Sequence, residues 1–157
     1  MSMVSPSPTQ TVRTLNELLR GEISAVETYG RALSLVHDDL DARQDLEECR
    51  ASHQDRAARL RAEIRHRGGD PASGSGAWGF LASLIGRVAS TAGPRVAIAA
   101  LELGEDHGLK EYEERLVRLD LPARSIVSAD FYPQQVRTHS IVSSLRTVMA
   151  MPPARAG

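Results

Sequence analysis

The sequence predicts an all-α fold, a four-helix bundle with one long connection. Three observations predict this fold. The 157 residues are rich in Ala, Leu, Arg and Glu and only 4% aromatic, which favours helix over sheet. Apolar residues recur at alternating spacings of three and four along four segments, as on the buried stripe of a bundle helix. Breaks rich in Gly, Pro and Asp separate these segments.

The first segment begins at Ser7-Pro8, because Ser can cap a helix and Pro is tolerated in its first turn. Gly68-Gly69-Asp70-Pro71 is a strong stop for the second. Pro133 lies inside the fourth and should kink it or separate its first turns. We expect the four helices at about 8–36, 40–67, 94–119 and 122–149.

Residues 70–93 form the long connection between the second and third helices. The other connections are tight, so the first and second helices, and the third and fourth, should be antiparallel pairs. A connection running the length of the bundle would make the second and third helices parallel. It contains an apolar segment, WGFLASLIGRV, expected to form a short extra helix at about 78–90 that packs across the bundle or at a dimer contact. The bundle is one domain at about 8–150, with flexible tails at 1–7 and 151–157.

Composition limits the classes of partner. The formal net charge of -1 and the pI near 6.5 argue against a nucleic-acid-binding protein driven by bulk charge. One Cys excludes an internal disulfide and suits a reducing compartment. No signal peptide is visible, and no stretch approaches the roughly 20 apolar residues of a membrane span. We therefore expect a cytoplasmic protein without nucleic-acid or membrane partners.

Polar residues interrupt or flank each apolar stripe near its middle. They are Glu22 in the first helix, His53 in the second, Glu102 and Glu105 in the third, and His139 beside the stripe of the fourth. The midpoints of equal helices share one level of a bundle, so these five side chains are expected to converge. Imidazole and carboxylate groups are ligands for iron, manganese or zinc. The alternative is a buried hydrogen-bond and ion-pair network without metal.

Several segments resemble the ferritin-like superfamily. LNELLRGEISAVETY, from Leu15 to Tyr29, is similar to the first helix of bacterioferritins. The run LELGEDHGLKEYEERL, followed by Leu121-Pro122, resembles a group of uncharacterised bacterial ferritin-like proteins. The resemblance covers about 11–149 and implies a ferritin-like bundle, a fold that often dimerises or forms cages, so we expect a homo-oligomer such as a dimer.

The resemblance also implies a set of metal ligands. The di-iron site of these proteins uses one Glu from each of two helices and Glu-x-x-His from each of the other two. Glu22 and Glu102 match the single glutamates, and His53 and His139 match the histidines. The bridging carboxylates are missing, because Arg50 and Val136 stand three residues before these histidines. Oxidase or oxygenase chemistry is therefore disfavoured.

Two compensations are open. Glu105 could supply a further carboxylate, as in the third helix of rubrerythrins, and Cys49 could supply a thiolate, which would favour zinc. Alternatively, Arg50 pairs with Glu105 and no metal binds. Two functions follow: a ferritin-like protein with a metal site or its remnant, acting in metal or stress handling, or a non-catalytic structural or interaction bundle.

Overall fold

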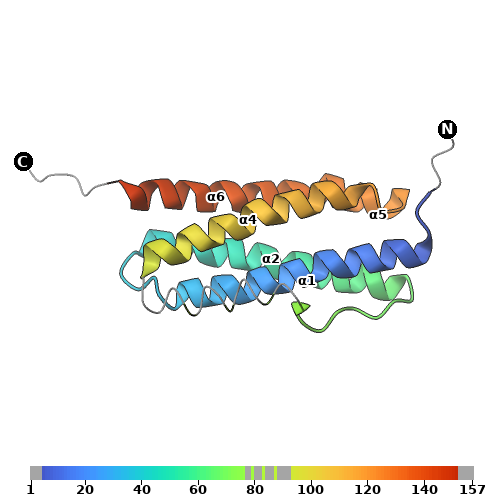
Figure 1. The fold of residues 1–157 in the computed structure, drawn as a ribbon, viewed down its shortest axis with the longest axis horizontal. Helices are drawn as coiled ribbons and strands as arrows, with labels where there is room; N and C mark the ends of the chain where they lie inside the picture. The colour runs from blue at the N-terminus through green and yellow to red at the C-terminus, as the bar shows by residue number, and fades with distance from the viewer. Residues whose placement is uncertain (1–4, 77–78, 80–82, 84–86, 88–92, 152–157) are drawn as a thin grey trace, which may run out of the picture.

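The computed structural model describes residues 5–76, 79, 83, 87 and 93–151. Four long helices account for most of the described chain, and no strand occurs in it. The expected helix at 78–90 and most of the two tails lie outside the described residues. The helices are α1 (Pro8–Leu33), α2 (Leu40–His66), α4 (Pro94–Leu116) and α6 (Tyr132–Ala150), with α5 (Leu121–Ile126) and the π-helical turn η2 (Val127–Phe131) leading into α6 (Figure 1).

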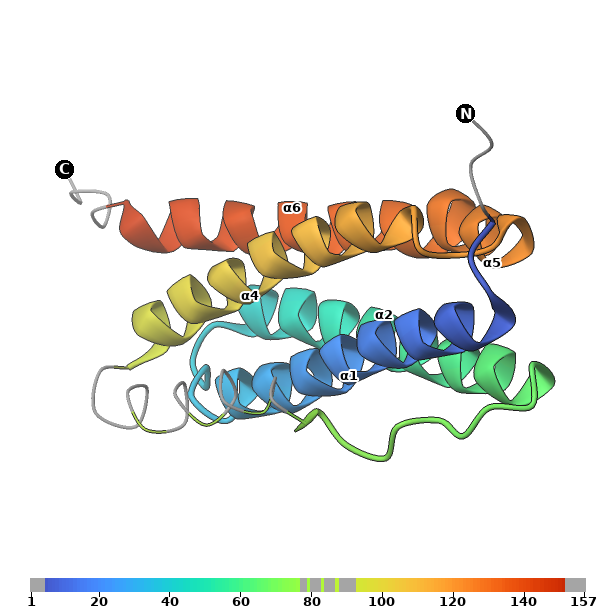
Figure 2. The same cartoon turned by 45° about the vertical axis from the view of Figure 1, so that its right-hand side comes forward.

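The four long helices form an elongated bundle of two antiparallel hairpins. The α1/α2 hairpin and the α4/α6 hairpin each pack more extensively within themselves than against each other. Figures 1 and 2 show α2 and α4 running in the same direction, as the long connection predicts. The described start of that connection follows α1, where Asn16 hydrogen-bonds the backbone of residues 70 and 72 and Ser75 donates to Glu27. The predicted all-α bundle with one long crossover is therefore confirmed.

The core consists of two apolar clusters with a polar layer between them. One cluster gathers side chains such as Leu46, Ile98 and Val142 toward one end of the bundle. The other gathers Leu19, Phe131 and neighbours toward the opposite end. Burial of these side chains is the main stabilising term, at about 25 cal/mol per Å² of apolar surface. In the second helix the three-four spacing predicts a buried stripe, and each of its members is buried: Leu46, Cys49, His53, Ala57, Leu60 and Ile64.

The fourth predicted helix consists of three joined pieces, α5, η2 and α6. Pro133 has no N–H to donate to the carbonyl four residues back, and its ring would crowd that turn. The chain widens into the π turn η2 just before it, where the Tyr132 N–H bonds the Val127 carbonyl five residues back. The helix continues without leaving the bundle, so Pro133 modifies the first turns and does not end the helix.

No described helix is both long and apolar enough to cross a membrane. This observation concerns the described residues alone.

Asp120 secures the connection between α4 and α5. Its Oδ1 accepts the Ala123 N–H at 3.0 Å as a helix cap, and its Oδ2 accepts from Arg67 at 2.5 Å. Its own N–H donates to Thr11 at 3.1 Å. One residue therefore joins the ends of α1, α2 and α5.

We predict that Asp120→Ala lowers the free energy of unfolding by about 1–2 kcal/mol, because the cap and the ion pair are both lost. Asp120→Asn keeps an acceptor for the cap and should cost less than half as much. Urea unfolding followed by circular dichroism measures both. Equal losses for the two variants would show that the cap contributes little.

Candidate functional site

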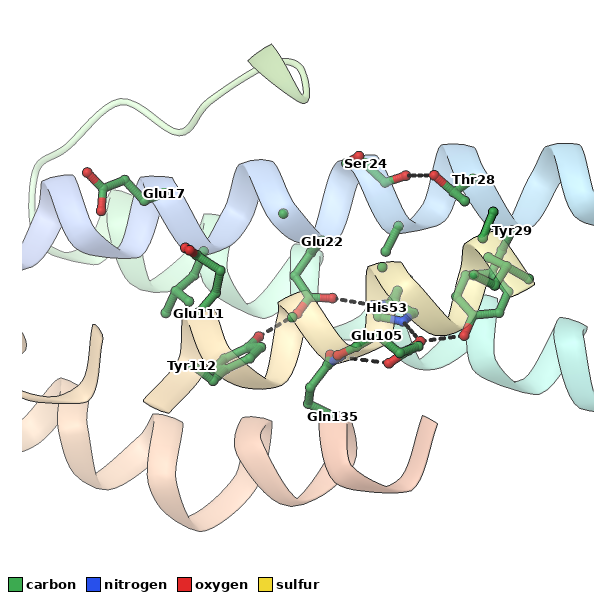
Figure 3. Close-up of a pocket in the computed structure, with 17 residues that line it drawn as sticks. Glu17, Glu22, Ser24, Thr28, Tyr29, His53, Glu105, Glu111, Tyr112 and Gln135 are labelled. Atoms are coloured by element: carbon green, nitrogen blue, oxygen red, sulfur yellow. Dashed lines mark hydrogen bonds and ion pairs between the residues drawn. The ribbon is translucent and has the colours of Figure 1, made fainter. Parts of the chain in front are cut away.

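Eight side chains from all four long helices form a polar layer at the centre of the bundle. Each helix supplies two, and every one is at most 3% exposed. Figure 3 shows several of them pointing toward one another. The polar layer consists of Glu22 and Tyr29 from α1, His53 and Arg56 from α2, Glu105 and Tyr112 from α4, and Gln135 and Thr138 from α6.

His53 joins the two carboxylates of the layer. Its Nδ1 lies 2.7 Å from Glu22 Oε2, and its Nε2 lies 2.9 Å from Glu105 Oε1. An ionised carboxylate can only accept, so each contact requires a proton on the ring nitrogen. The geometry therefore favours a protonated imidazolium between two carboxylates.

Arg56 is the second cation of the layer, and it is fully buried. Its Nε donates to Glu22 at 3.0 Å, and its Nη2 donates to the Gln135 side-chain carbonyl at 2.9 Å. Nη1 donates to Ser52 at 3.0 Å. Nη2 also lies 2.7 Å from His53 Nδ1, and the charge of Arg56 opposes the protonation of His53 that Glu22 and Glu105 favour.

The two carboxylates accept hydrogen bonds from side chains on every neighbouring helix. Glu22 accepts from the Tyr112 hydroxyl at 2.5 Å in addition to His53 and Arg56. Glu105 accepts from the Tyr29 hydroxyl as well as from His53. Its other oxygen accepts from two α6 side chains, Gln135 Nε2 at 2.7 Å and Thr138 Oγ1 at 2.9 Å. Protein donors therefore occupy seven of the roughly eight acceptor positions that two carboxylates offer.

The electrostatic environment keeps both carboxylates ionised. Burial alone would raise the pKa of Glu22, but the charges of Arg56 and His53 lower it from 4.5 to about 2. Burial would also raise the pKa of Glu105, but the hydrogen bond and the charge of His53 lower it. Burial would lower the pKa of His53, yet the Glu22 charge and the two carboxylate hydrogen bonds raise it above 6.5. Burial raises the pKa of Tyr29 and Tyr112, so both stay neutral donors.

The structure brings together three of the five predicted site residues, Glu22, His53 and Glu105. Glu102 and His139 lie outside the polar layer, which corrects the expected convergence. Glu102 accepts from Ser143 at 2.9 Å and from Arg146 near the surface, because Leu101 takes the buried position beside it. His139 contacts Asp106 at 2.6 Å with its side chain 26% exposed. Metal binding by any of the five residues stays a prediction.

Two alternatives raised by the sequence concern Arg50 and Cys49, and the structure answers the first. Arg50 does not pair with Glu105; it lies against Gly30 of α1, and its buried Nε has no hydrogen-bond partner among the described residues. Cys49 is buried beside the layer, and burial raises the pKa of its thiol to about 12. The thiol therefore stays protonated near neutral pH.

The sequence analysis missed Arg56, Gln135 and Thr138 as members of the site. Arg56 is one of many arginines in the second helix, a composition typical of a solvated face, although it stands three residues after His53 and therefore shares its face. Gln135 and Thr138 fall on the three-four spacing that predicts the buried stripe of the fourth helix, and both are buried. Their polar character on a buried stripe was the signal that could have identified them.

A cavity of about 60 Å³ between α1 and α4 borders the polar layer (Figure 3). The space exists because several residues that line it are small, including Gly21, Ala25, Ala100 and Gly104. Glu22, His53 and Glu105 are among the residues that line it. By volume it holds about four water molecules. No group of three or more His, Cys, Asp or Glu side chains within the described parts of the chain is arranged to hold a metal ion.

Comparison with protein families identifies the chain. Residues 10–117 match the model of a family described as a domain of unknown function, DUF2383. The chain belongs to this family. The matched segment covers α1, α2 and α4, and with them six of the eight residues of the polar layer. No curated protein matches this DUF2383 member.

A solved structure of similar fold is a two-domain protein from Anabaena variabilis ATCC 29413 with a DJ-1/ThiJ/PfpI-like domain and a ferritin-like domain. The TM-score is 0.73 at 17% identity, over 98% of this chain. The chain spans 41% of the length of that protein. At this identity the similarity concerns the fold, and it confirms the predicted ferritin-like bundle.

We predict that stability depends on pH through His53 and Glu22. The raised pKa of His53 stabilises the fold fully below pH 6.5, and this contribution is lost as pH rises through the folded-state pKa. The lowered pKa of Glu22 stabilises the fold above pH 4.5, and this contribution is lost as pH falls toward 2. The free energy of unfolding should therefore be highest between about pH 4.5 and 6.5.

Urea titrations from about pH 3 to pH 9 measure this profile. His53→Gln should remove most of the alkaline decline and leave the acid decline in place. An alkaline decline of equal size in wild type and His53→Gln would mean that another group titrates.

A pair of glycines in α4 tests the packing of the layer. A Cβ on Gly108 would lie 2.5 Å from the Gln135 Nε2, which is held by Glu105, whereas a Cβ on Gly104 meets nothing within 4 Å. Gly108→Ala should lower the free energy of unfolding by about 1–2 kcal/mol by breaking that hydrogen bond. Gly104→Ala should raise it by up to about 1 kcal/mol through helix propensity. Thermal unfolding of both variants measures the difference, and a gain for Gly108→Ala would contradict the close packing.

Proposed function

We propose that this protein is a non-catalytic, ferritin-like structural or interaction bundle, in which an ion-pair network of its own side chains replaces a resident metal. The observation that carries this proposal is the position of Arg56. Its guanidinium is fully buried in the layer where the ferritin-like di-iron proteins hold metal, and it pairs with Glu22.

The donor set supports the proposal. A metal ion needs free lone pairs on the carboxylates, and protein donors already use nearly all of them. A metal bound by Glu22 and Glu105 would have to displace Arg56, His53 or a tyrosine hydroxyl. The residues present therefore do not fit a di-iron centre.

The charges lead to the same proposal. The layer contains two carboxylates and two cationic side chains, Arg56 and the imidazolium of His53, so its formal charge is zero. Burial of an unpaired carboxylate is costly, and in di-iron proteins the metal offsets that cost. Here the chain supplies the compensating charge itself.

The network would set the register of the two hairpins. Four of its contacts join α1/α2 to α4/α6: Tyr29–Glu105, His53–Glu105, Tyr112–Glu22 and Arg56–Gln135. Apolar clusters tolerate sliding better than directional hydrogen bonds do. A buried polar layer that fixes register is the best-attested use of such groups.

Metal analysis tests the proposal. Wild-type protein purified without chelators, then loaded with iron, manganese and zinc and desalted, should contain fewer than about one metal per ten chains. Glu105→Gln should leave that content unchanged while lowering stability. A content near one metal per chain that falls in Glu105→Gln would instead support a metal site built on Glu22, His53 and Glu105.

A comparison of two arginine variants separates the buried ion pair of Arg56 from the partly exposed ion pair of Arg59. Arg56→Met leaves Glu22 buried without its main partner and should cost about 3–5 kcal/mol. Arg59→Met, on the same helix, removes an arginine that is 41% exposed and pairs with Asp130, and should cost about 1 kcal/mol or less. Similar losses in the two variants would contradict the central role of Arg56.

A further inference from the structure

We propose that the cavity between α1 and α4 binds a short primary alkylamine. Its ammonium group would lie between Glu17 and Glu111, and its carbon chain would lie against the small residues of the two helices. This site goes beyond the proposed function, because it gives the bundle a small-molecule ligand and leaves the hydrogen bonds of the polar layer in place.

Glu17 and Glu111 form one end of the cavity, the acidic end, and this end reaches solvent. Both residues line the cavity, Glu17 from α1 and Glu111 from α4, and Figure 3 shows them on the same side of Glu22. The Glu17 side chain is 31% exposed and the Glu111 side chain 17%, whereas the carboxylates of the polar layer are at most 3% exposed. A ligand that enters from solvent therefore meets two carboxylates first.

The two carboxylates of the acidic end share one arginine among the described residues. Arg115 Nη2 lies 2.5 Å from Glu111, and Arg115 Nε lies 3.2 Å from Glu17 without forming a hydrogen bond. His107 approaches the other oxygen of Glu111 at 3.6 Å and adds a positive charge only when it is protonated. The polar layer is neutral by itself, so one negative charge remains at the acidic end. An ammonium group complements that charge and can donate hydrogen bonds to Glu17.

The walls of the cavity suit an unbranched carbon chain. Gly21 and Ala25 of α1 and Ala100 and Gly104 of α4 line it, and none of them carries more than a methyl group. These walls offer apolar surface and no charge to a ligand. The volume of about 60 Å³ corresponds to about four non-hydrogen atoms, if each takes the space of one water molecule. Larger or branched ligands are therefore excluded.

The distance between the acidic end and the polar layer sets the length of the ligand. Glu17 stands five residues before Glu22 on α1, and Glu111 stands six residues after Glu105 on α4. These separations correspond to about 7–9 Å along the helix axes. Four carbons and one nitrogen extend about 5–6 Å, since each bond is about 1.5 Å long. An alkylamine of about this length fits with its ammonium at the acidic end and its methyl group short of the layer.

Titration of the full chain with n-butylammonium chloride tests the site. Calorimetry near neutral pH should show one ligand per chain with a Kd on the order of 0.1–1 mM. The ligand should also raise Tm. No saturable binding up to about 20 mM would overturn the inference.

Two other probes test the role assigned to each end of the ligand. 1-Butanol has a similar shape but no charge, so it should bind at least about ten-fold more weakly than n-butylammonium. 1,4-Diaminobutane would bring a second ammonium toward the cations of the polar layer and should also bind at least about ten-fold more weakly. Equal affinity for 1-butanol would overturn the assigned head group, and equal affinity for the diamine would overturn the assigned position of the carbon chain.

A pair of charge variants tests the acidic end. Glu17→Gln removes the unbalanced charge and should weaken n-butylammonium binding at least about five-fold. Glu114→Gln is the matched control, because Glu114 is 51% exposed, pairs with Lys110 and does not line the cavity. The control should change the Kd by less than about two-fold. Equal weakening in the two variants would mean that general surface charge attracts the amine, and this result overturns the site.

Gly104→Leu tests the position of the carbon chain. A Cβ at this position meets nothing within 4 Å, so a larger side chain can enter the cavity, and it should weaken binding at least about ten-fold. If circular dichroism shows that this variant does not fold, Gly104→Ala should still weaken binding about three-fold. Unchanged affinity in the folded variant overturns the inference. Metal content does not depend on this site, so failure of amine binding leaves the proposed function intact.

Discussion

The burial of Arg56 against Glu22 is the interaction on which the rest of the structure depends. A guanidinium withdrawn fully from water loses several kcal/mol of hydration, and only a close anion and further acceptors restore it. Glu22, Ser52 and Gln135 supply those acceptors from three helices. The same contact keeps Glu22 ionised, so that it can hold His53. The other side chains of the polar layer therefore depend on the pair of Arg56 and Glu22.

His53 extends the pair across the bundle. Arg56 binds the carboxylate of its own hairpin, whereas His53 also reaches Glu105 on α4. The apolar clusters on either side supply most of the burial, but apolar contacts are non-directional and specify register less strictly than hydrogen bonds do. Such a slide would leave two carboxylates and two cations without partners. The polar layer thus contributes specificity that the larger apolar area does not.

The fold could be predicted from the sequence because helical periodicity is a local property. The stripes of α2 and α6 were identified from spacing alone, including Gln135. In α4 the predicted stripe was displaced by one position at Glu102, where Leu101 is buried instead. Small residues in this helix, such as Gly104 and Gly108, weaken the apolar signal that would distinguish a stripe through Leu101 from one through Glu102.

The site could be predicted only in part, because its partners are distant in sequence. Glu22, His53 and Glu105 interrupt apolar stripes, and an interruption is visible in one segment. Arg56 shares the face of His53, but it lies in a helix with many arginines, and its charge is typical of a solvated position. Its role depends on Glu22 and on Gln135, 79 residues away. Only the assembled bundle places the three together.

Stability alone does not explain four buried charges. Replacement of a buried ion network by well-packed apolar residues is often neutral or stabilising by about 1–4 kcal/mol. A chain without a metal would therefore gain from Leu or Met at these positions if the layer served stability only. Loss of one member lowers the stability of the fold while the others remain, because it leaves a buried charge without its partner. A network of buried charges such as this one can therefore be changed only by steps that keep its charge balanced.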